Sequence, residues 1–269
     1  MKITEQQSNY SGLDVMTTEE ILEGINNEDR TVPEAVGSII PEIGMLVDGV
    51  VSRMRQGGRL FYIGAGTSGR LGVVDASEIP PTFGASPGLV IGLIAGGDGA
   101  IRRAVEGAED DPEQGWKDIL AFSPTPADTL VGIAASGTTP YVIGAVRTAR
   151  TRGLLTSCIT CNPDTPLAEA AEIPIVAVVG PEFVTGSTRM KAGTATKLIL
   201  NMISTAAMIR LGHVRGNRMI DMQITNSKLI DRGTRMIMEE TGLKDYDRAR
   251  GLLLEYGSVR RAVDSFGGD

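Results

Sequence analysis

The stretch RLFYIGAGTSGR at residues 59–70 is the clearest indication of the fold in this sequence. It begins with the apolar, β-prone run Arg59–Ile63, continues into a glycine-rich loop, and carries the hydroxyls of Thr67 and Ser68 ahead of a helical segment. A buried strand that runs through such a loop into a helix is typical of α/β proteins with a parallel sheet.

Four further apolar runs repeat this pattern, at residues 89–95, 129–134, 154–160 and 173–179. Right-handed crossovers in such a sheet place all the strand ends, with their Gly, Ser and Thr residues, on one edge. The sequence therefore predicts a doubly wound parallel sheet flanked by helices. The helix-like stretches between and after these runs include residues 101–107, 141–150 and 196–210.

Helical sequence also lies at both ends of the chain. Thr17 to Glu20 resembles an N-cap with an acidic first turn, and a second helical stretch with one apolar face follows Pro33. After a boundary near Thr241, the tail has room for two short helices. We expect three segments, at residues 1–56, 57–218 and 219–269.

Composition narrows the function classes. Of 269 residues, 42% are hydrophobic and 22% charged, which is the balance of a soluble globular protein. With 26 basic and 33 acidic side chains the net charge is −7, which disfavours nucleic acid as a partner. Neither a signal peptide nor a membrane-spanning apolar run is recognisable, and two cysteines suit a reducing compartment. We expect a cytoplasmic protein with no membrane partner.

Three hydroxyl-rich loops are expected on the shared edge of the sheet. Each comes just before a helical segment, where backbone N–H groups and Ser or Thr hydroxyls form a cradle for an anion. A phosphate ester on a polar ligand explains three such loops better than three unrelated capped turns. The predicted binding residues are Gly66, Thr67, Ser68, Ser136, Gly137, Thr138, Thr139, Ser187, Thr188 and Lys191.

A dinucleotide or nucleotide site and a redox-active cysteine pair are both disfavoured. The loop after residue 63 satisfies G-x-G-x-x-G, but the next strand does not end in the acidic residue that a dinucleotide site needs, and no Walker lysine follows. Cys158 and Cys161 lie along a strand that runs into Asn162-Pro163, whereas a redox pair prefers a helix N-terminus. The single histidine, His213, lies in a loop-like segment, where we expect a surface or structural role.

Three long motifs carry a family resemblance: GAGTSGRLGVVDASEIPPTFG, GIAASGTTPYVIGAV and TGSTRMKAGTATKLILNMIST. They resemble the sugar isomerase (SIS) domain, placed here at 57–218, and more narrowly the N-acetylmuramic acid 6-phosphate etherase family. The likeness extends from INNEDRTVPEAV to GNRMIDMQITNSKL, while the helical tail after residue 241 is shorter than in many relatives. It implies a cytoplasmic, homodimeric lyase without cofactor or metal, which releases D-lactate and N-acetylglucosamine 6-phosphate during muramic acid catabolism and cell-wall recycling.

The chemistry of that reaction asks for two carboxyl groups. In the open-chain sugar the C2 proton is α to the aldehyde and the lactyl ether at C3 is a β leaving group, so elimination needs a base at C2 and an acid for the departing alkoxide. The resemblance implies Glu78 as proton donor and Glu109 as the second catalytic residue, and we assign Glu109 as the C2 base. Without the resemblance, the acidic run at 109–111 would favour a solvated face.

Two alternatives stay open. A sugar-phosphate isomerase uses the same scaffold and also abstracts a C2 proton, but it needs no acid for a leaving group. A non-catalytic sugar-phosphate sensor would resemble the glucokinase regulatory protein, which carries two SIS modules where this chain has room for one.

Overall fold

The computed structural model describes residues 2–224 and 226–266, and its contacts divide the chain into two compact units. The sheet unit comprises Met1–Ser77 and Val90–Ala207, and the helical unit comprises Glu78–Leu89 and Met208–Asp269. The predicted N-terminal segment falls within the sheet unit, and the division into three segments stays a prediction.

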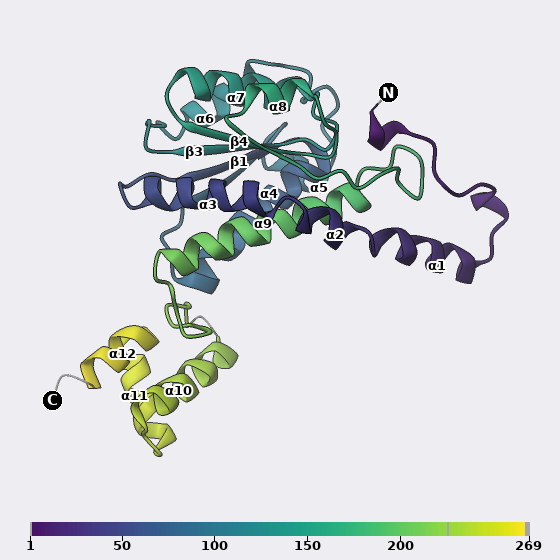
Figure 1. Ribbon diagram of the computed structural model, residues 1–269. Coiled ribbons are helices and arrows are strands. Elements are labelled where there is room, and N and C mark those ends of the chain that lie inside the picture. The colour runs from purple at the N-terminus through teal and green to yellow at the C-terminus, as the bar shows by residue number, and fades with distance from the viewer. Residues whose placement is uncertain (1, 225, 267–269) are drawn as a thin grey trace. The chain divides into compact units, whose positions relative to one another are not determined.

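Five parallel strands form the sheet, in the order β2-β1-β3-β4-β5 (Figure 1). All five apolar runs predicted as strands are confirmed, although the last strand ends three residues earlier than expected. The strands are β1 (Leu60–Gly64), β2 (Val90–Ile94), β3 (Thr129–Ile133), β4 (Leu155–Thr160) and β5 (Ile173–Val176).

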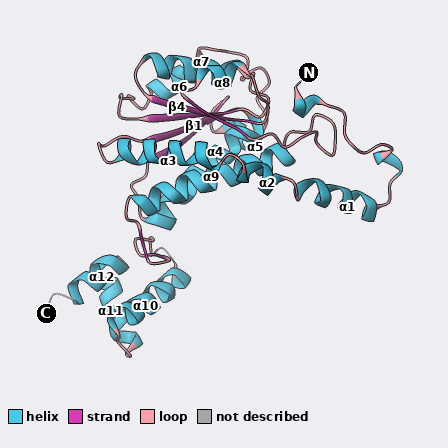
Figure 2. Cartoon of the chain, viewed as in Figure 1, coloured by secondary structure: helices cyan, strands magenta, loops and turns pink. Residues whose placement is uncertain are grey.

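Helices cover both faces of this sheet, which confirms the doubly wound architecture (Figure 2). Helices α6 (Gln114–Leu120), α7 (Pro140–Thr151) and α8 (Pro166–Ala170) lie on one face. Helices α3 (Ile40–Met54) and α9 (Lys191–Arg210) lie on the other, together with the first turns of α4, which spans Gly66–Phe83. The predicted helix over 101–107 is only the single turn of α5 (Gly99–Arg102), because the four residues that follow are exposed and bury no apolar face.

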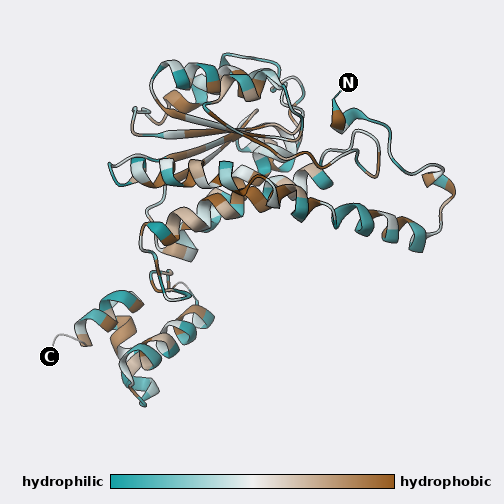
Figure 3. Ribbon diagram, in the orientation of Figure 1, coloured by the Kyte–Doolittle hydropathy of each residue, from teal (hydrophilic) through white to brown (hydrophobic). Residues whose placement is uncertain are grey.

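The larger core lies between the sheet and helices α6 to α8. In Figure 3 the strands are predominantly hydrophobic, whereas the outward side of α7 is hydrophilic. Alternate residues of β1 point to opposite faces, so Phe61 and Ile63 enter this core while Tyr62 faces α4. The main buried side chains of this core are Phe61, Ile63, Ile119, Leu130, Tyr141, Val142, Val146 and Leu167.

The N-terminal helices begin as their caps predict. Helix α1 (Thr18–Asp29) starts at a capping box in which the Glu20 N–H donates to the Thr17 hydroxyl at 3.3 Å and the Thr17 N–H donates to the Glu20 carboxylate at 2.7 Å. The single helix expected after Pro33 is two, α2 (Val32–Gly37) and α3. Pro41 causes the break, since it lies in the first turn of α3 and has no N–H to continue the preceding helix. Two short 3-10 turns, Ile3–Glu5 and Leu13–Val15, precede α1.

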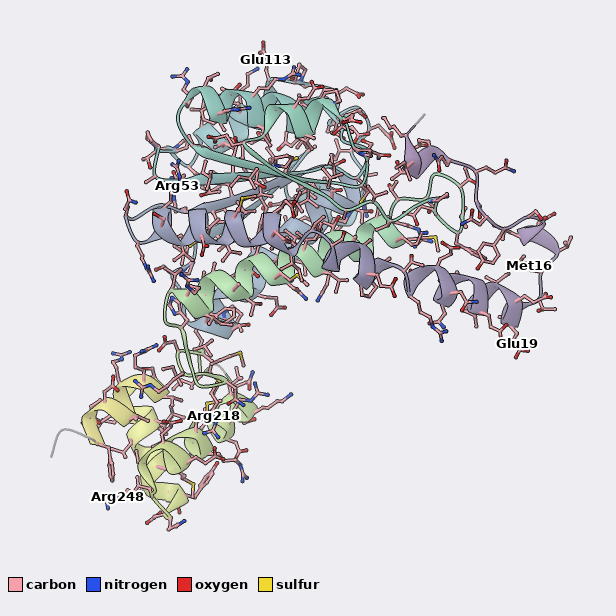
Figure 4. All side chains as sticks on the ribbon, viewed as in Figure 1. Met16, Glu19, Arg53, Glu113, Arg218 and Arg248 are labelled. Carbon is pink, nitrogen blue, oxygen red and sulfur yellow. The ribbon has the colours of Figure 1, made fainter. Side chains whose placement is uncertain are left out.

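The C-terminal end of helix α3 is hydrogen-bonded to the loops that precede two strands of the sheet. The Arg53 guanidinium donates to the carbonyl oxygens of Pro126 and Gly153, which lie just before β3 and β4 (Figure 4). Among residues 2–224 and 226–266, no single helix has the length and apolarity to cross a membrane. The bent pair of segments Thr18–Gly37 and Ile40–Met54, at 58°, passes that test only when taken together.

The helical unit has its own small core. Helix α10 (Ser227–Thr241) ends at Gly242, which has a φ of +76°, and this confirms the predicted boundary. The two expected short helices follow as α11 (Tyr246–Tyr256) and α12 (Val259–Phe266). The buried side chains include Ile220, Met222, Ile237, Leu253, Val259 and Ala262, and a hairpin of β6 (Val214–Arg215) and β7 (Arg218–Met219) precedes α10.

Candidate functional site

A cavity of about 420 Å³ lies at the carboxyl ends of β1 and β3, within the sheet unit. The structure thus brings together loops that the sequence places some 70 residues apart. The predicted site residues on its wall are Gly66, Thr67, Ser68, Glu109, Ser136, Thr138, Thr139 and Thr188. The remaining wall includes Lys2, Asp110, Gly193 and Thr196, which sequence reasoning did not single out.

The first loop turns the chain from β1 into α4 with very little space. A Cβ atom on Gly69 would lie 2.7 Å from the carbonyl oxygen of Gly64, so this close approach of strand and helix requires glycine. Thr67 and Ser68 consequently occupy the first turn of α4 and line the cavity. The N–H groups of a first turn have no partner within the helix and are available to an anion.

The second loop leads from β3 into α7. The Ser136 hydroxyl accepts hydrogen bonds from the Thr138 N–H at 3.3 Å and from the Thr138 hydroxyl at 3.2 Å. Gly137 has a φ of +68°, and a Cβ atom there would lie 2.4 Å from the Thr165 hydroxyl oxygen, so only glycine fits. Gly137 does not line the cavity; it shapes the loop that presents its two neighbours. Pro140 then begins α7 at a position where a missing N–H costs nothing.

Glu109 is held beside this second loop by its own backbone. Its carbonyl oxygen accepts the N–H of Tyr141, in the first turn of α7, at 3.0 Å. Glu109 is exposed, and both Glu109 and Asp110 line the cavity. Asp111 has a separate task, since its carboxylate accepts the Glu113 N–H at 2.8 Å near the start of α6. All three residues of the acidic run are exposed, and two of them also line the cavity.

Glu78 is exposed and lies on α4, outside the set of residues that line the cavity. The paired prolines Pro80 and Pro81 predict that this helix ends at Glu78, but the helix continues to Phe83. The fixed φ of proline is compatible with a helix, and the two lost N–H groups fall near the helix end. Ile79 and Phe83 are buried, so these last turns keep an apolar contact. The acid role of Glu78 stays a prediction.

In the third loop, before α9, the predicted phosphate-binding lysine does not face the cavity. The Lys191 side chain is buried and its ammonium pairs with the Glu28 carboxylate of α1, so it does not line the cavity. The buried Glu182 carboxylate accepts the N–H groups of Lys191 and Ala192, at 2.8 and 3.0 Å. The first turn of α9 therefore binds the protein's own carboxylate. Ser187 also lies off the wall, and a phosphate role for Lys191 or Ser187 stays a prediction.

The cysteines and the histidine lie outside the cavity wall. Cys158 and Cys161 are fully buried, and burial raises the pKa of each thiol to about 12, so both are protonated at neutral pH. His213, in the helical unit, has its Nδ1 atom 3.3 Å from Asp221, which also pairs with Arg260 at 2.7 Å. In the described ranges, no group of three or more His, Cys, Asp or Glu side chains is arranged to hold a metal ion.

Comparison with solved structures supports the fold. A phosphoheptose isomerase from Francisella tularensis superposes with a TM-score of 0.55 at 20% identity, covering 72% of this chain and all of that one. A protein of E. coli CFT073 gives a TM-score of 0.54 at 16% identity, covering 75% of this chain and 97% of that one. At these identities the likeness concerns architecture alone. The family model of the glucokinase regulatory protein N-terminal SIS domain matches residues 42–150.

Sequence relatives are much closer. An N-acetylmuramic acid 6-phosphate etherase of Porphyromonas gingivalis strain W83 is 64% identical over 264 residues, which cover 98% of this chain and 96% of that protein. An etherase of the same name from Bacteroides thetaiotaomicron is 60% identical, covering 99% and 96%. A third, from Pectobacterium atrosepticum, is 56% identical but is covered only to 79% of its length. The chain belongs to the N-acetylmuramic acid 6-phosphate etherase family.

Proposed function

We propose that this chain is a carbon–oxygen lyase that cleaves the D-lactyl ether of N-acetylmuramic acid 6-phosphate to N-acetylglucosamine 6-phosphate and D-lactate. Relatives of that name match nearly its whole length. The observation that carries the proposal is the position of Glu109, whose backbone is hydrogen-bonded to the first turn of α7 and which lines the same cavity as Ser and Thr residues of the three predicted loops.

Phosphate binding follows from the two loops. The first turns of α4 and α7 begin at the cavity, and the hydroxyl-bearing residues Thr67, Ser68, Ser136 and Thr138 line it. Helix N-termini attract anions through unpaired N–H groups and the helix dipole. A phosphate held there fixes the position of the sugar, so that the remaining carbons extend across the cavity.

Glu109 then removes the proton at C2 of the open-chain sugar. The electron pair of that C–H bond forms the C2–C3 double bond as the C3–O bond breaks, and Glu78 donates a proton to the departing lactyl oxygen. The products of this step are D-lactate and an unsaturated aldehyde. Water adds at C3, where the Glu78 carboxylate accepts its proton, and protonated Glu109 returns a proton to C2. The sum is addition of water across the ether, with no oxidation or reduction and hence no need for a redox cofactor.

Enclosure of the reactive aldehyde favours a homodimer, because a site at the edge of a sheet is open to water. Support comes from large apolar side chains that are exposed on the N-terminal helices, namely Leu22, Ile40 and Met45. Light scattering on the purified chain tests this assembly. We place the reaction in the cytoplasm, in muramic acid catabolism.

A second candidate is a non-catalytic sugar-phosphate sensor, favoured by the match to the glucokinase regulatory protein SIS domain. The two proposals separate in one assay. Purified protein is incubated with N-acetylmuramic acid 6-phosphate and D-lactate is followed enzymatically, with Glu78→Gln and Glu109→Gln alongside. Glu113→Gln, which removes an exposed carboxylate that pairs with Lys117, is the matched control.

The etherase proposal predicts lactate release by the wild type and by the control. Loss of one catalytic proton transfer typically costs about 10²–10⁴-fold in rate, and this is the loss expected in each of the two catalytic variants. Saturable binding of the sugar phosphate without lactate release would instead support the sensor.

A further inference from the structure

The N-terminal segment of the chain lies beside the cavity, more than 130 residues away in sequence from the loop it contacts. Thr4 is fully buried, and its N–H donates to the side-chain oxygen of Asn162 at 3.2 Å. The Asn162 amide group donates in return to the Thr4 hydroxyl at 3.0 Å and to the carbonyl of Ala135 at 2.9 Å. A buried side chain therefore joins the N-terminal segment directly to the loop after β3.

A second attachment follows four residues later. The Ser8 N–H donates to the Thr185 hydroxyl at 2.9 Å, and the Ser8 hydroxyl donates to the carbonyl of Phe183 at 2.7 Å. Both partners belong to the loop before α9. Residues 2–8, the N-terminal strap, are thus tied to two of the three loops predicted to form the site (Figure 1).

The strap places one ammonium group on the cavity wall. The Lys2 ammonium donates to the Thr138 hydroxyl at 2.6 Å, and that hydroxyl donates in turn to Ser136 at 3.2 Å. Over the described residues, Lys2 carries the only cationic side chain that lines the cavity, and the anionic ones are Glu109 and Asp110. Lys191, the lysine predicted to bind the phosphate, instead forms an ion pair with Glu28.

With this charge distribution, binding of a phosphate requires a compensating positive charge in the cavity. A phosphate monoester carries up to two negative charges at neutral pH, and it would share the cavity with two carboxylates. Helix N-termini contribute only partial positive charge, equivalent to about half an elementary charge each. A full positive charge beside the hydroxyl loop offsets the repulsion and gives the phosphate a charge-assisted hydrogen bond.

We propose that Lys2 is the phosphate-binding cation of this site and that the buried Thr4–Asn162 contact positions it there. When the ligand binds, the ammonium moves its hydrogen bond from the Thr138 hydroxyl to a phosphate oxygen, and the hydroxyl becomes a second donor to the same group. The identity of the ligand as a sugar phosphate rests on the proposed function, whereas the binding of a phosphate anion by Lys2 does not.

The experiment compares Lys2→Ala, Lys2→Arg and Thr4→Val with the wild type, and uses Lys244→Ala, at an exposed loop position of the helical unit, as the charge-matched control. Dissociation constants for inorganic phosphate and for N-acetylglucosamine 6-phosphate are measured by calorimetry. The kcat and KM for D-lactate release are measured on the same preparations. Thermal unfolding of each variant shows whether the fold is intact.

Loss of a charge-assisted hydrogen bond predicts that Lys2→Ala weakens binding of both phosphates by about 10- to 150-fold. Its KM should rise by a similar factor while kcat changes little, because Lys2 contacts the phosphate and not the reacting carbons. Lys2→Arg should recover most of the affinity. Thr4→Val keeps the Lys2 ammonium but removes the hydroxyl that Asn162 contacts, so its phosphate affinity should lie between those of Lys2→Ala and the wild type.

Unchanged phosphate affinity in Lys2→Ala, or a wild type that binds neither phosphate at millimolar concentration, would overturn the inference. A wild type that binds phosphate through Lys2 but releases no D-lactate would leave the inference standing and reject the proposed etherase reaction.

Discussion

Asp75 offers a prediction whose magnitude follows from its surroundings. It lies on α4 facing β1, where one carboxylate oxygen accepts the Ser204 hydroxyl of α9 at 3.1 Å. Burial raises the pKa of Asp75 to about 6, even though the hydroxyls of Ser204 and Tyr62 and the charge of Lys197 oppose that shift. Against the ordinary aspartate value of 3.8, the pKa rises by about two units, and at about 1.4 kcal/mol per unit this is worth about 3 kcal/mol.

The sign of the effect follows from proton binding. Between pH 4 and pH 6 the folded protein retains a proton on Asp75 that the unfolded chain has already lost, so the free energy of unfolding falls as the pH rises. Below pH 4 the carboxyl is neutral in both states and destabilises nothing. Above pH 6 the full cost of a buried carboxylate is present.

Replacement of Asp75 by Asn removes this titration while keeping an acceptor for Ser204. We expect the variant and the wild type to be about equally stable near pH 4, and the variant to gain up to about 3 kcal/mol over the wild type by pH 7. Urea unfolding followed by circular dichroism between pH 4 and 8 measures the difference, and Asp98→Asn controls for the loss of an exposed charge. A stability difference that stays constant with pH, or that favours the wild type as the pH rises, would show that the pKa of Asp75 is not raised in the folded protein.

Three further outcomes test the site's framework. Gly137→Ala should destabilise the fold by about 1–3 kcal/mol and raise KM, since it strains the backbone and meets Thr165; equal stability in urea titration would contradict this. Glu182→Gln should cost about 1–3 kcal/mol because a charged acceptor of two N–H groups is lost, and faster hydrogen exchange in the first turn of α9 would reveal it. Cys158 and Cys161 should react with a thiol reagent only after unfolding, because both thiols are buried and protonated. Rapid labelling of either cysteine in the native protein would contradict this.

Local pattern was sufficient to predict the sheet. Apolar runs of five to seven residues that end in Gly, Ser, Asn or Pro became strands, and the predicted capping residue Thr17 lies where α1 begins. The same reasoning predicted α4 to end before its prolines and failed. Whether a proline near a helix end stops the helix depends on the burial of neighbours such as Ile79 and Phe83, which local sequence does not encode.

The candidate site was predictable only in its loops. Hydroxyl and glycine residues after a strand are visible as a pattern, and most of them lie on the cavity wall. Charge placement was not predictable: Lys191 is paired with a glutamate 163 residues away, and Lys2 contacts a loop 136 residues away. Such pairings depend on the tertiary fold, so a cation near a phosphate loop in sequence need not be the one near it in space.

Isotope labelling shows whether the ether breaks by elimination and water addition at the sugar. The reaction is run in water enriched in oxygen-18 and, separately, in heavy water, and both products are analysed by mass spectrometry and NMR. Elimination followed by water addition predicts oxygen-18 in the C3 hydroxyl of N-acetylglucosamine 6-phosphate, deuterium at its C2, and no oxygen-18 in D-lactate. Oxygen-18 in the lactate hydroxyl, or complete retention of the original C2 proton, would contradict it.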